Sequence, residues 1–476
     1  MQTLFLAFLL SGPDNRPPHP ADAIAAALRV AKAEPNPKNV RFLWLGHHEE
    51  KSREATWRAL AGHLNQLCRE SEIVKCEPAG GWSGELLRID PADFGWPLEV
   101  WEKLADQEPY LHVGVKVTIA WDGFKWVDNG TGEHKRTIRR VALAPWVLDT
   151  PERLAAATDL AALSGSNVPV VMADWFLWQT CQQAERVPGY YDFLGIKNQK
   201  DFEKLIGFSR EAMGKRKELL EVVAKSGVAR QPRRIAAFPT IGRMHLWKTF
   251  DNQLAEGERN PLRVLTDEFK FDASEEFGPL PNGFWTWGLF AADGTRQDSA
   301  PDFIGPDKTS PSNDGRIHVC LSCVRCHYSP GNGGRAGIQG IDGWSRHLFR
   351  EGGTTPLQSP SPDKLRELRQ KYLRDLAGPV DDDRRIHRRS VLEATGLEPD
   401  EWSAAFAKLY ASHDADVGLD RAAADCGVTP ARLREAMDAK RKRGGLDLIL
   451  ATLLDGGKVG IRQWSEAIVL AHEVLK

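Results

Sequence analysis

This chain contains the motif Cys323-Val-Arg-Cys326-His327. If the motif binds one ligand, the fold must place two thiols and an imidazole side by side. Cys-x-x-Cys-His is the pattern by which a c-type haem is attached covalently. Two thiols three residues apart, here Cys323 and Cys326, can each form a thioether with one of the two haem vinyl groups. The histidine that follows, His327, is then placed under the iron, where a neutral imidazole nitrogen serves as proximal ligand. The sequence therefore predicts one haem c, tethered at Cys323 and Cys326 and ligated by His327.

A third cysteine, Cys320, leaves two other interpretations open. It extends the motif to Cys-x-x-Cys-x-x-Cys, which is similar to the first three ligands of an iron–sulfur run, but Ser329–Pro330 stands where the fourth cysteine belongs. Structural zinc usually joins two separated pairs of ligands, so a compact zinc site is less typical. Such a zinc site, in a metal-stabilised binding module, would use Cys320, Cys323, Cys326 and His327. A cluster of buried thiols without any cofactor is the remaining alternative.

Composition narrows the class of protein. The 476 residues are enough for about two to four domains. The formal net charge is −2, so nothing indicates nucleic acid or an anionic membrane surface as a partner. Seven cysteines are too few for a disulfide framework in a chain of this length, although a Cys68–Cys76 bridge is compatible with the spacing.

The N-terminus bears on localisation. Residues 1–12 contain a short apolar run without a positively charged start or a small-residue cleavage pattern, so we interpret the run as a weak or truncated export signal or as a short buried strand. No other stretch approaches the roughly 20 apolar residues that a membrane helix needs. Because a c-type haem is attached outside the cytoplasm, the motif predicts a periplasmic or otherwise exported protein.

Periodicity and turn signals predict an α+β fold, with β-hairpins and helices in the first two-thirds and a helical C-terminal third. No clean helical unit surrounds the haem motif, so the motif is expected in an irregular loop. The expected organisation is an N-terminal segment and linker (1–37), an α+β domain (38–230), a haem-binding segment with a hairpin (231–358) and a helical region (359–476).

Individual elements follow from the same signals. A strand is expected over 40–47, a helix over about 50–68, and a hairpin at Asp122-Gly123, a strong turn signal. The segment 200–225 is expected to be helical, and 238–251 irregular and aromatic. The strand expected within 280–294 should pair with 295–303. The charged run 381–385 is expected at the surface. Residues 419–426 and 430–440 are expected to form a helical hairpin. Such hairpins are common, so this one is only weak evidence for DNA binding.

Several stretches carry a resemblance to known proteins: Leu87–Trp96 with Trp101-Glu102, Val168–Phe176, Leu280–Gly283, Ala300-Pro301, Cys323–His327 and Ala422–Val428. Taken in chain order, they resemble a group of large, poorly characterised bacterial proteins that carry a single cytochrome c-type haem motif. The resemblance is loose from about residue 40 to 463 and specific only at these stretches. It implies an exported haem protein and supplies no substrate.

The distal side of the haem decides what such a protein can do. A second axial ligand favours electron transfer, whereas an open face favours small-molecule chemistry. His245 and Met244 are the candidate distal ligands, with Met172 a further alternative, and the resemblance favours His245. A histidine would give a lower potential than a methionine. His318 and His347 are weaker candidates, and Arg243 and Lys248 are candidate partners for the haem propionates.

These observations predict a c-type cytochrome that transfers electrons, and an electron carrier is favoured over an enzyme. The alternative is a peroxidase-like haem enzyme with an open distal site, and the zinc-stabilised binding module is the third hypothesis. A low-spin, six-coordinate iron would indicate the first and a high-spin iron the second. The sequence names neither the redox partner nor a small-molecule substrate.

Overall fold

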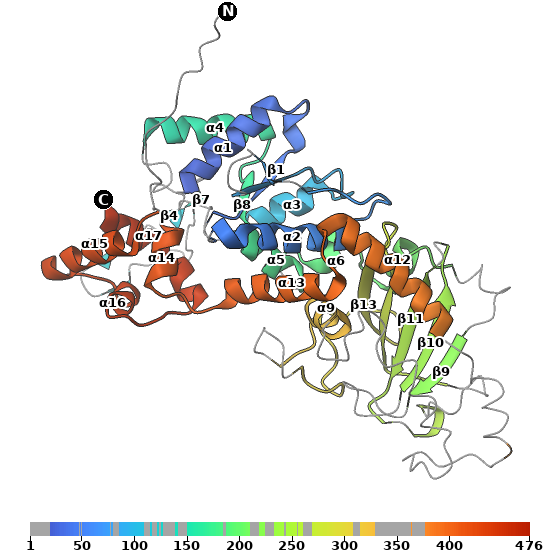
Figure 1. Ribbon diagram of the computed structural model, residues 1–476. Helices are drawn as coiled ribbons and strands as arrows, with labels where there is room; N and C mark the ends of the chain where they lie inside the picture. The colour runs from blue at the N-terminus through green and yellow to red at the C-terminus, as the bar shows by residue number, and fades with distance from the viewer. Residues whose placement is uncertain are drawn as a thin grey trace, which may run out of the picture.

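The structure is a computed structural model of the 476-residue chain, and it has the mixed α+β class that the sequence predicts (Figure 1). The C-terminal part is helical, as expected. In the part that is described, no helix combines the length and the apolar character that crossing a membrane requires. The structure describes residues 20–46, 48, 50–76, 78–79, 85–108, 115–116, 121–122, 125–126, 139–140, 150–183, 187–209, 219–223, 233–241, 244–254, 256–259, 269–307, 315–328, 363 and 377–476.

The first sheet has four strands in the order β2-β3-β1-β8. Strand β1 pairs antiparallel with β3 and parallel with β8. All four residues of β1 are buried, as in a strand covered on both faces. The strands are β1 (Arg41–Trp44), β2 (Pro78–Ala79), β3 (Leu86–Ile89) and β8 (Val170–Met172). The helices of this region are α1 (Pro20–Ala33), α2 (Glu50–Gln66), α3 (Leu98–Ala105), α4 (Pro151–Ser164) and α5 (Ala173–Thr180).

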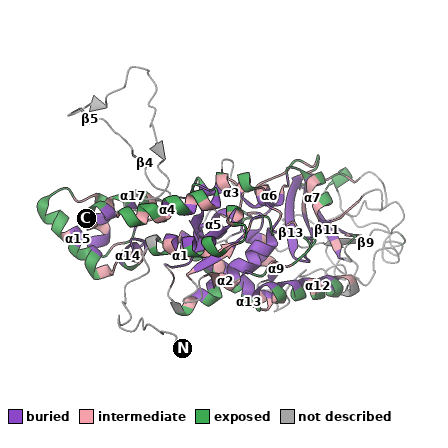
Figure 2. Ribbon diagram, turned by 90° about the horizontal axis from the view of Figure 1, so that it is seen from above, coloured by how far each residue is buried: buried purple, intermediate pink, exposed green. Residues whose placement is uncertain are grey.

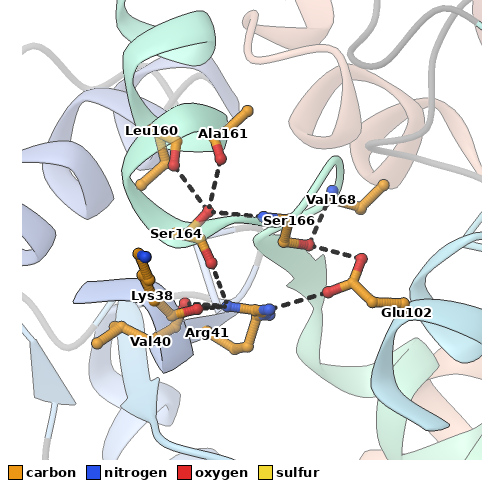
Figure 3. Close-up of polar contacts among 9 residues, drawn as sticks. All are labelled: Lys38, Val40, Arg41, Glu102, Leu160, Ala161, Ser164, Ser166 and Val168. Atoms are coloured by element: carbon orange, nitrogen blue, oxygen red, sulfur yellow. Dashed lines mark hydrogen bonds and ion pairs between the residues drawn. The ribbon is translucent and has the colours of Figure 1, made fainter. Parts of the chain in front are cut away.

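A buried arginine ties these layers together (Figure 3). The Arg41 side chain is only 2% exposed, and its guanidinium donates to the carbonyl oxygens of Lys38, Val40 and Ser164 at 2.9–3.1 Å. It also forms an ion pair with Glu102 at 2.9 Å. The second carboxylate oxygen of Glu102 accepts from the Ser166 hydroxyl at 2.9 Å. One charged side chain thus joins β1, α3 and the end of α4.

We expect Arg41→Ala to lower the free energy of unfolding by about 3 kcal/mol, the low end for breaking a buried ion pair, because Glu102 keeps some contact with water. Three carbonyl oxygens would also lose their donor. Urea denaturation of the two proteins measures the difference. Lys38→Ala is the control, since only the carbonyl of Lys38 takes part. A loss of unfolding free energy below about 1 kcal/mol would show that the neighbouring residues move to fill the space left by the Arg41 side chain.

The second sheet has five antiparallel strands in the order β13-β12-β11-β10-β9. Two expectations were wrong here: part of 200–225 is a strand rather than a helix, and 238–251 contains two paired strands rather than irregular chain. The strand in 280–294 pairs along its length with 273–279, which precedes it. The expected partner, 295–303, contributes one antiparallel bridge, between Phe290 and Arg296, beside which the Gln297 N–H donates to the Leu289 carbonyl at 2.8 Å. The strands are β9 (Leu219–Val223), β10 (Arg233–Pro239), β11 (His245–Asp251), β12 (Ala273–Pro279) and β13 (Trp285–Ala291).

The outer edge of β13 is covered by α6 (Tyr190–Leu194). The backbone N–H of Trp287 donates to the Tyr190 hydroxyl at 3.0 Å, and that of Leu289 donates to the Tyr191 hydroxyl at 2.9 Å. Both tyrosines are fully buried. Two side chains thus satisfy these backbone donors, and residues 295–297 pair with the adjoining end of the same edge, where the Gln297 N–H donates to the Leu289 carbonyl at 2.8 Å.

Helices cover both faces of this sheet. Helix α7 (Gln199–Leu205) packs on one face, where Phe202 contacts Phe290. Helix α9 (Leu321–Tyr328) and helix α12 (Ala377–Thr395) lie against the other face, which carries Trp247, Phe277 and Trp287 on neighbouring strands (Figure 1).

The C-terminal helices extend from the sheet to the opposite end of the molecule (Figure 1). Helix α13 contacts α2, α5 and α9, so this region packs on the earlier ones. Figure 2 shows α5 and β13 buried in the middle of the molecule, while α15 is largely exposed. The expected hairpin over 419–440 is present as α14 and α15. The helices are α13 (Pro399–Asp414), α14 (Leu419–Asp425), α15 (Pro430–Arg443), α16 (Leu448–Leu454) and α17 (Ile461–Leu475).

The remaining elements are short. The hairpin expected around Asp122-Gly123 is present: Trp121 pairs with Trp126, and Asp122 itself pairs with Lys125 as part of β5. Strand β9 precedes the boundary expected at 230 yet belongs to the sheet that follows it. The short elements are η1 (Pro37–Asn39), η2 (Gly257–Arg259), β4 (Val115–Lys116), β5 (Trp121–Asp122), β6 (Lys125–Trp126) and β7 (Arg139–Arg140).

Candidate haem site

The Cys-x-x-Cys-His motif lies on a helix, α9, and the expectation of an irregular loop was wrong. The helix is explained by apolar side chains at helical spacing: Leu321, Val324 and Tyr328 are all buried. Their spacing of three and then four residues places them on one face of the helix. The sequence prediction missed this because the helix has only eight residues and is followed by a Gly-rich stretch outside the described residues.

The three motif side chains share the other face of α9. Cys323, Cys326 and His327 occupy positions i, i+3 and i+4, which are neighbours on a helix surface. All three are half-buried, in contrast to the fully buried residues of the opposite face. We call this the open face of α9. The fold thus presents the two thiols and the imidazole together, with the rest of the helix fixed in the core.

The start of α9 is fixed by backbone contacts. The N–H of Leu321 donates to the carbonyl oxygen of Cys181 at 2.9 Å, which links α9 to the end of α5. The backbone N–H of His318 donates to the Ser322 hydroxyl, and the Ser322 N–H returns a bond to the His318 carbonyl, both at 3.1 Å. Cys320, between them, has a φ of +68°, the left-handed region that side chains other than glycine rarely adopt. The chain turns sharply there to begin the helix.

The open face lies near one part of the five-stranded sheet. The ring of His327 lies 5.2 Å from that of Phe277, centroid to centroid. Glu275, two residues earlier on β12, is on the same face of the sheet. Its carboxylate accepts from Arg233 at 2.6 Å. Burial, and then the charge of Glu275, raises the pKa of the Cys323 thiol well above its ordinary value.

Burial is also the main reason why the thiol of Cys326 is neutral. Burial raises the pKa of the Cys326 thiol to about 11, although the neighbouring Arg325 opposes the shift. Arg325 itself forms an ion pair with Asp307. Both motif cysteines are therefore protonated at neutral pH, which is unlike a catalytic thiolate. If a haem were held here, Cys323 and Cys326 would each supply one thioether sulfur.

The buried face of α9 rests on an aromatic cluster. The Tyr328 ring lies 5.1 Å from His387 and 5.5 Å from Trp402, centroid to centroid. His387 stacks on Trp285 at 4.6 Å, and burial lowers the pKa of His387 to about 3, so its imidazole is neutral. A rigid support of this kind holds the open face of α9 in one orientation. We define the aromatic cluster as Trp285, Trp287, Tyr328, His387 and Trp402.

The extra cysteine points away from the open face. Cys320 is fully buried, and its thiol donates to the side-chain oxygen of Gln66 on α2 at 3.3 Å. Burial raises its pKa well above the ordinary value. Among the described residues, no group of three or more His, Cys, Asp or Glu side chains is arranged to hold a metal ion.

We expect Cys320→Ser to leave covalent haem attachment unchanged, because the Cys320 thiol faces Gln66 rather than the open face. Haem per polypeptide, measured by pyridine haemochrome absorbance against protein concentration, should equal that of the unaltered protein. Serine keeps the size and the donor of the side chain, so the fold is little disturbed. A drop in haem content would instead place Cys320 among the tethers.

The first candidate distal ligand, His245, lies at the start of β11. Its Nδ1 is 3.1 Å from a carboxylate oxygen of Asp383, on α12. The ring centroids of His245 and Trp247 lie 5.9 Å apart. Trp247 stacks on Phe277, with 6.2 Å between their ring centroids. Because Phe277 contacts His327, a series of ring contacts connects the two histidines on one face of the sheet.

The other candidates have different surroundings. Met244 is buried in the core, where its carbonyl accepts from Thr240, and Met172 is buried in β8 of the first sheet. Lys248 lies on the face of the sheet opposite Phe277 and pairs with Glu276 at 2.7 Å, so it is directed away from the open face. His318 precedes α9, where its N–H is bonded to Ser322. Arg243 and His347 lie outside the described residues.

Sequence reasoning missed Asp383 and Glu275. The run 381–385 was expected at the surface, and Asp381 and Asp382 are exposed, but Asp383 is fully buried. Val380 and His387, at i−3 and i+4 from Asp383, are buried as well, and this helical spacing was the available signal. Glu275 had no local signal, because its proximity to the motif depends on how β12 packs against α9.

The residues of this site fit a c-type haem. The donor set is the required one, and the three groups lie on one face of a helix whose other face is fixed. Comparison with known proteins adds nothing further: no family model, curated protein or solved structure matches the chain.

Proposed function

We propose that this protein is a c-type cytochrome that binds one covalent haem through Cys323, Cys326 and His327 and transfers electrons. The observation that carries the proposal is the open face of α9, where the two thiols and the imidazole are neighbours. A haem bound there would supply a one-electron Fe(III)/Fe(II) couple. His327 would be the proximal ligand, and the thioethers would prevent the haem from dissociating.

The chain's own contribution is to hold the ligands still. The aromatic cluster fixes α9 from below, and Phe277 packs against the His327 ring. A ligand held by packing on a buried helix moves little when the charge of the iron changes. This favours an electron carrier over a protein that must reorganise around a substrate. His245 is the distal ligand that we propose, with Met244 as the alternative.

Localisation and partners follow from the same proposal. Covalent haem attachment implies export to the periplasm or an equivalent compartment. The function then requires a redox partner protein that delivers or accepts single electrons.

The test is to produce the protein with a cytochrome c maturation system and export it, then stain a denaturing gel for haem and record the visible spectrum. Haem that remains on the denatured chain, with a sharp low-spin spectrum on reduction, is the expected result. Covalent haem with a high-spin spectrum would favour the haem enzyme. Absence of haem, with zinc or iron–sulfur content instead, would overturn both and support the metal-stabilised module.

A further inference from the structure

We propose that Asp383 is a positioning residue for His245: it holds the imidazole in the tautomer that carries its proton on Nδ1 and presents Nε2 as the nitrogen that binds iron. The inference rests on the proposed function, since it concerns the distal side of the same haem. It assigns a role to a carboxylate on α12 that lies 138 residues from His245 in the sequence.

The geometry around Asp383 is specific. One carboxylate oxygen lies 3.1 Å from Nδ1 of His245. The other accepts from the indole Nε1 of Trp247 at 2.7 Å and from the backbone N–H of His245 at 3.2 Å. The Asp383 side chain is fully buried, whereas that of His245 is 17% exposed. Three donors from one strand thus converge on one carboxylate.

These contacts determine the tautomer of His245. An ionised carboxylate can only accept hydrogen bonds, so a neutral imidazole beside it must donate from Nδ1. The lone pair then resides on Nε2, the nitrogen on the opposite side of the ring from Asp383. Within the described residues, the hydrogen bonds and ion pairs of Asp383 all come from β11 and include no lysine or arginine. The Asp383 carboxyl group is therefore directed at this histidine and its strand.

A carboxylate behind a metal-bound histidine is a common arrangement, because it orients the ring and makes the ligand more basic. A more basic ligand stabilises Fe(III) relative to Fe(II). Asp383 should accordingly lower the reduction potential of the haem. A purely structural tie between α12 and β11 would leave the potential unaffected, so the two roles can be separated.

The variant Asp383→Asn separates the positioning role from the structural role, because an amide keeps the size of the side chain but presents an NH₂ donor. With its oxygen toward the two donors at Trp247 and the His245 backbone, the NH₂ group faces Nδ1 of His245. Nδ1 must then accept, which moves the imidazole proton to Nε2 and removes the lone pair from the ligating nitrogen.

The experiment compares haem-loaded Asp383→Asn with the unaltered protein by visible and electron paramagnetic resonance spectra and by redox titration. We expect low-spin iron to be replaced by high-spin iron. Losing such a partner typically costs metal affinity by about tenfold at the lower end. With that loss falling on ferric iron, the ratio of ferrous to ferric iron at a fixed potential should rise about tenfold in the fraction that remains low-spin, which is ~59 mV for a one-electron couple. Haem staining of each denatured chain confirms equal loading.

Two controls isolate the role of Asp383. Asp382→Asn makes the same chemical change one residue away on the exposed side of α12. Ser390→Ala loosens α12 by removing a buried hydrogen bond to the Asn282 carbonyl, 2.9 Å long, without touching β11. Both should keep the low-spin spectrum and the potential.

The outcomes distinguish this inference from the proposed function. An unaltered protein without covalent haem would overturn the proposed function and the inference with it. Covalent haem whose spin state changes in His245→Ala but stays the same in Asp383→Asn would overturn the inference alone. If Asp383→Asn does not fold, ¹⁵N-histidine NMR of the unaltered ferrous protein decides. An exchange-protected Nδ1–H on His245 is expected, and a proton on Nε2 would overturn the inference.

Discussion

Replacement of both Cys323 and Cys326 with alanine is expected to abolish covalent haem attachment. The two thiols lie on the open face of α9 beside His327, and the described structure brings no other thiol to this face. Haem should be absent from the denatured chain in a stained gel, a loss of at least a hundredfold in signal. The folded chain should persist, because both residues are half-buried and face away from the aromatic cluster.

Single substitutions sharpen this prediction. Cys323→Ala and Cys326→Ala should each keep one thioether, which shifts the reduced absorption band to longer wavelength because one vinyl group remains conjugated. Cys68→Ala is the matched control, because Cys68 is a buried thiol just after α2 whose Sγ donates to the Glu70 carbonyl. Full staining of the double variant would show that the haem is held elsewhere.

Trp402→Ala is expected to lower the free energy of unfolding by about 3–5 kcal/mol, the range for deleting a large buried aromatic side chain. The indole is fully buried and contacts Phe284, Tyr328 and Phe406, and its Nε1 donates to the Ala59 carbonyl at 3.0 Å. Because Tyr328 belongs to α9, the same change should also loosen α9. Urea denaturation monitored by circular dichroism measures the loss.

Trp57 provides the control for this change. It is also a tryptophan on a helix, but it is only half-buried and contacts Arg58 on the surface of α2. Trp57→Ala should therefore cost less than half as much as Trp402→Ala. A cost for Trp402→Ala below about 1 kcal/mol would contradict the view that the aromatic cluster supports α9.

The sequence predicted the parts of this molecule that depend on local spacing. The α+β class, the helix after β1 and the hairpin at Asp122-Gly123 are all confirmed. The motif residues Cys323, Cys326 and His327 are indeed neighbours, as their spacing requires. Whether they bind haem stays a prediction.

The errors have a common physical origin in long-range packing. Segment 238–251 was expected to be irregular and aromatic, yet β10 and β11 pair with each other and with β9 and β12. Asp383 was assigned to the surface because it sits in a charged run, but α12 turns it toward His245. Strand β12 and Asp383 both lie outside the segment 238–251, so no window confined to that segment contains them.

The two tyrosine hydroxyls on the outer strand have a consequence for solubility. An uncovered edge strand can template the addition of a strand from another molecule, which is a route to aggregation. Tyr190 and Tyr191 occupy the N–H groups of Trp287 and Leu289 that an incoming strand would need. The apolar strand β13 can therefore lie beside α9 at the border of its sheet with these two positions closed to a strand from a second copy of the chain.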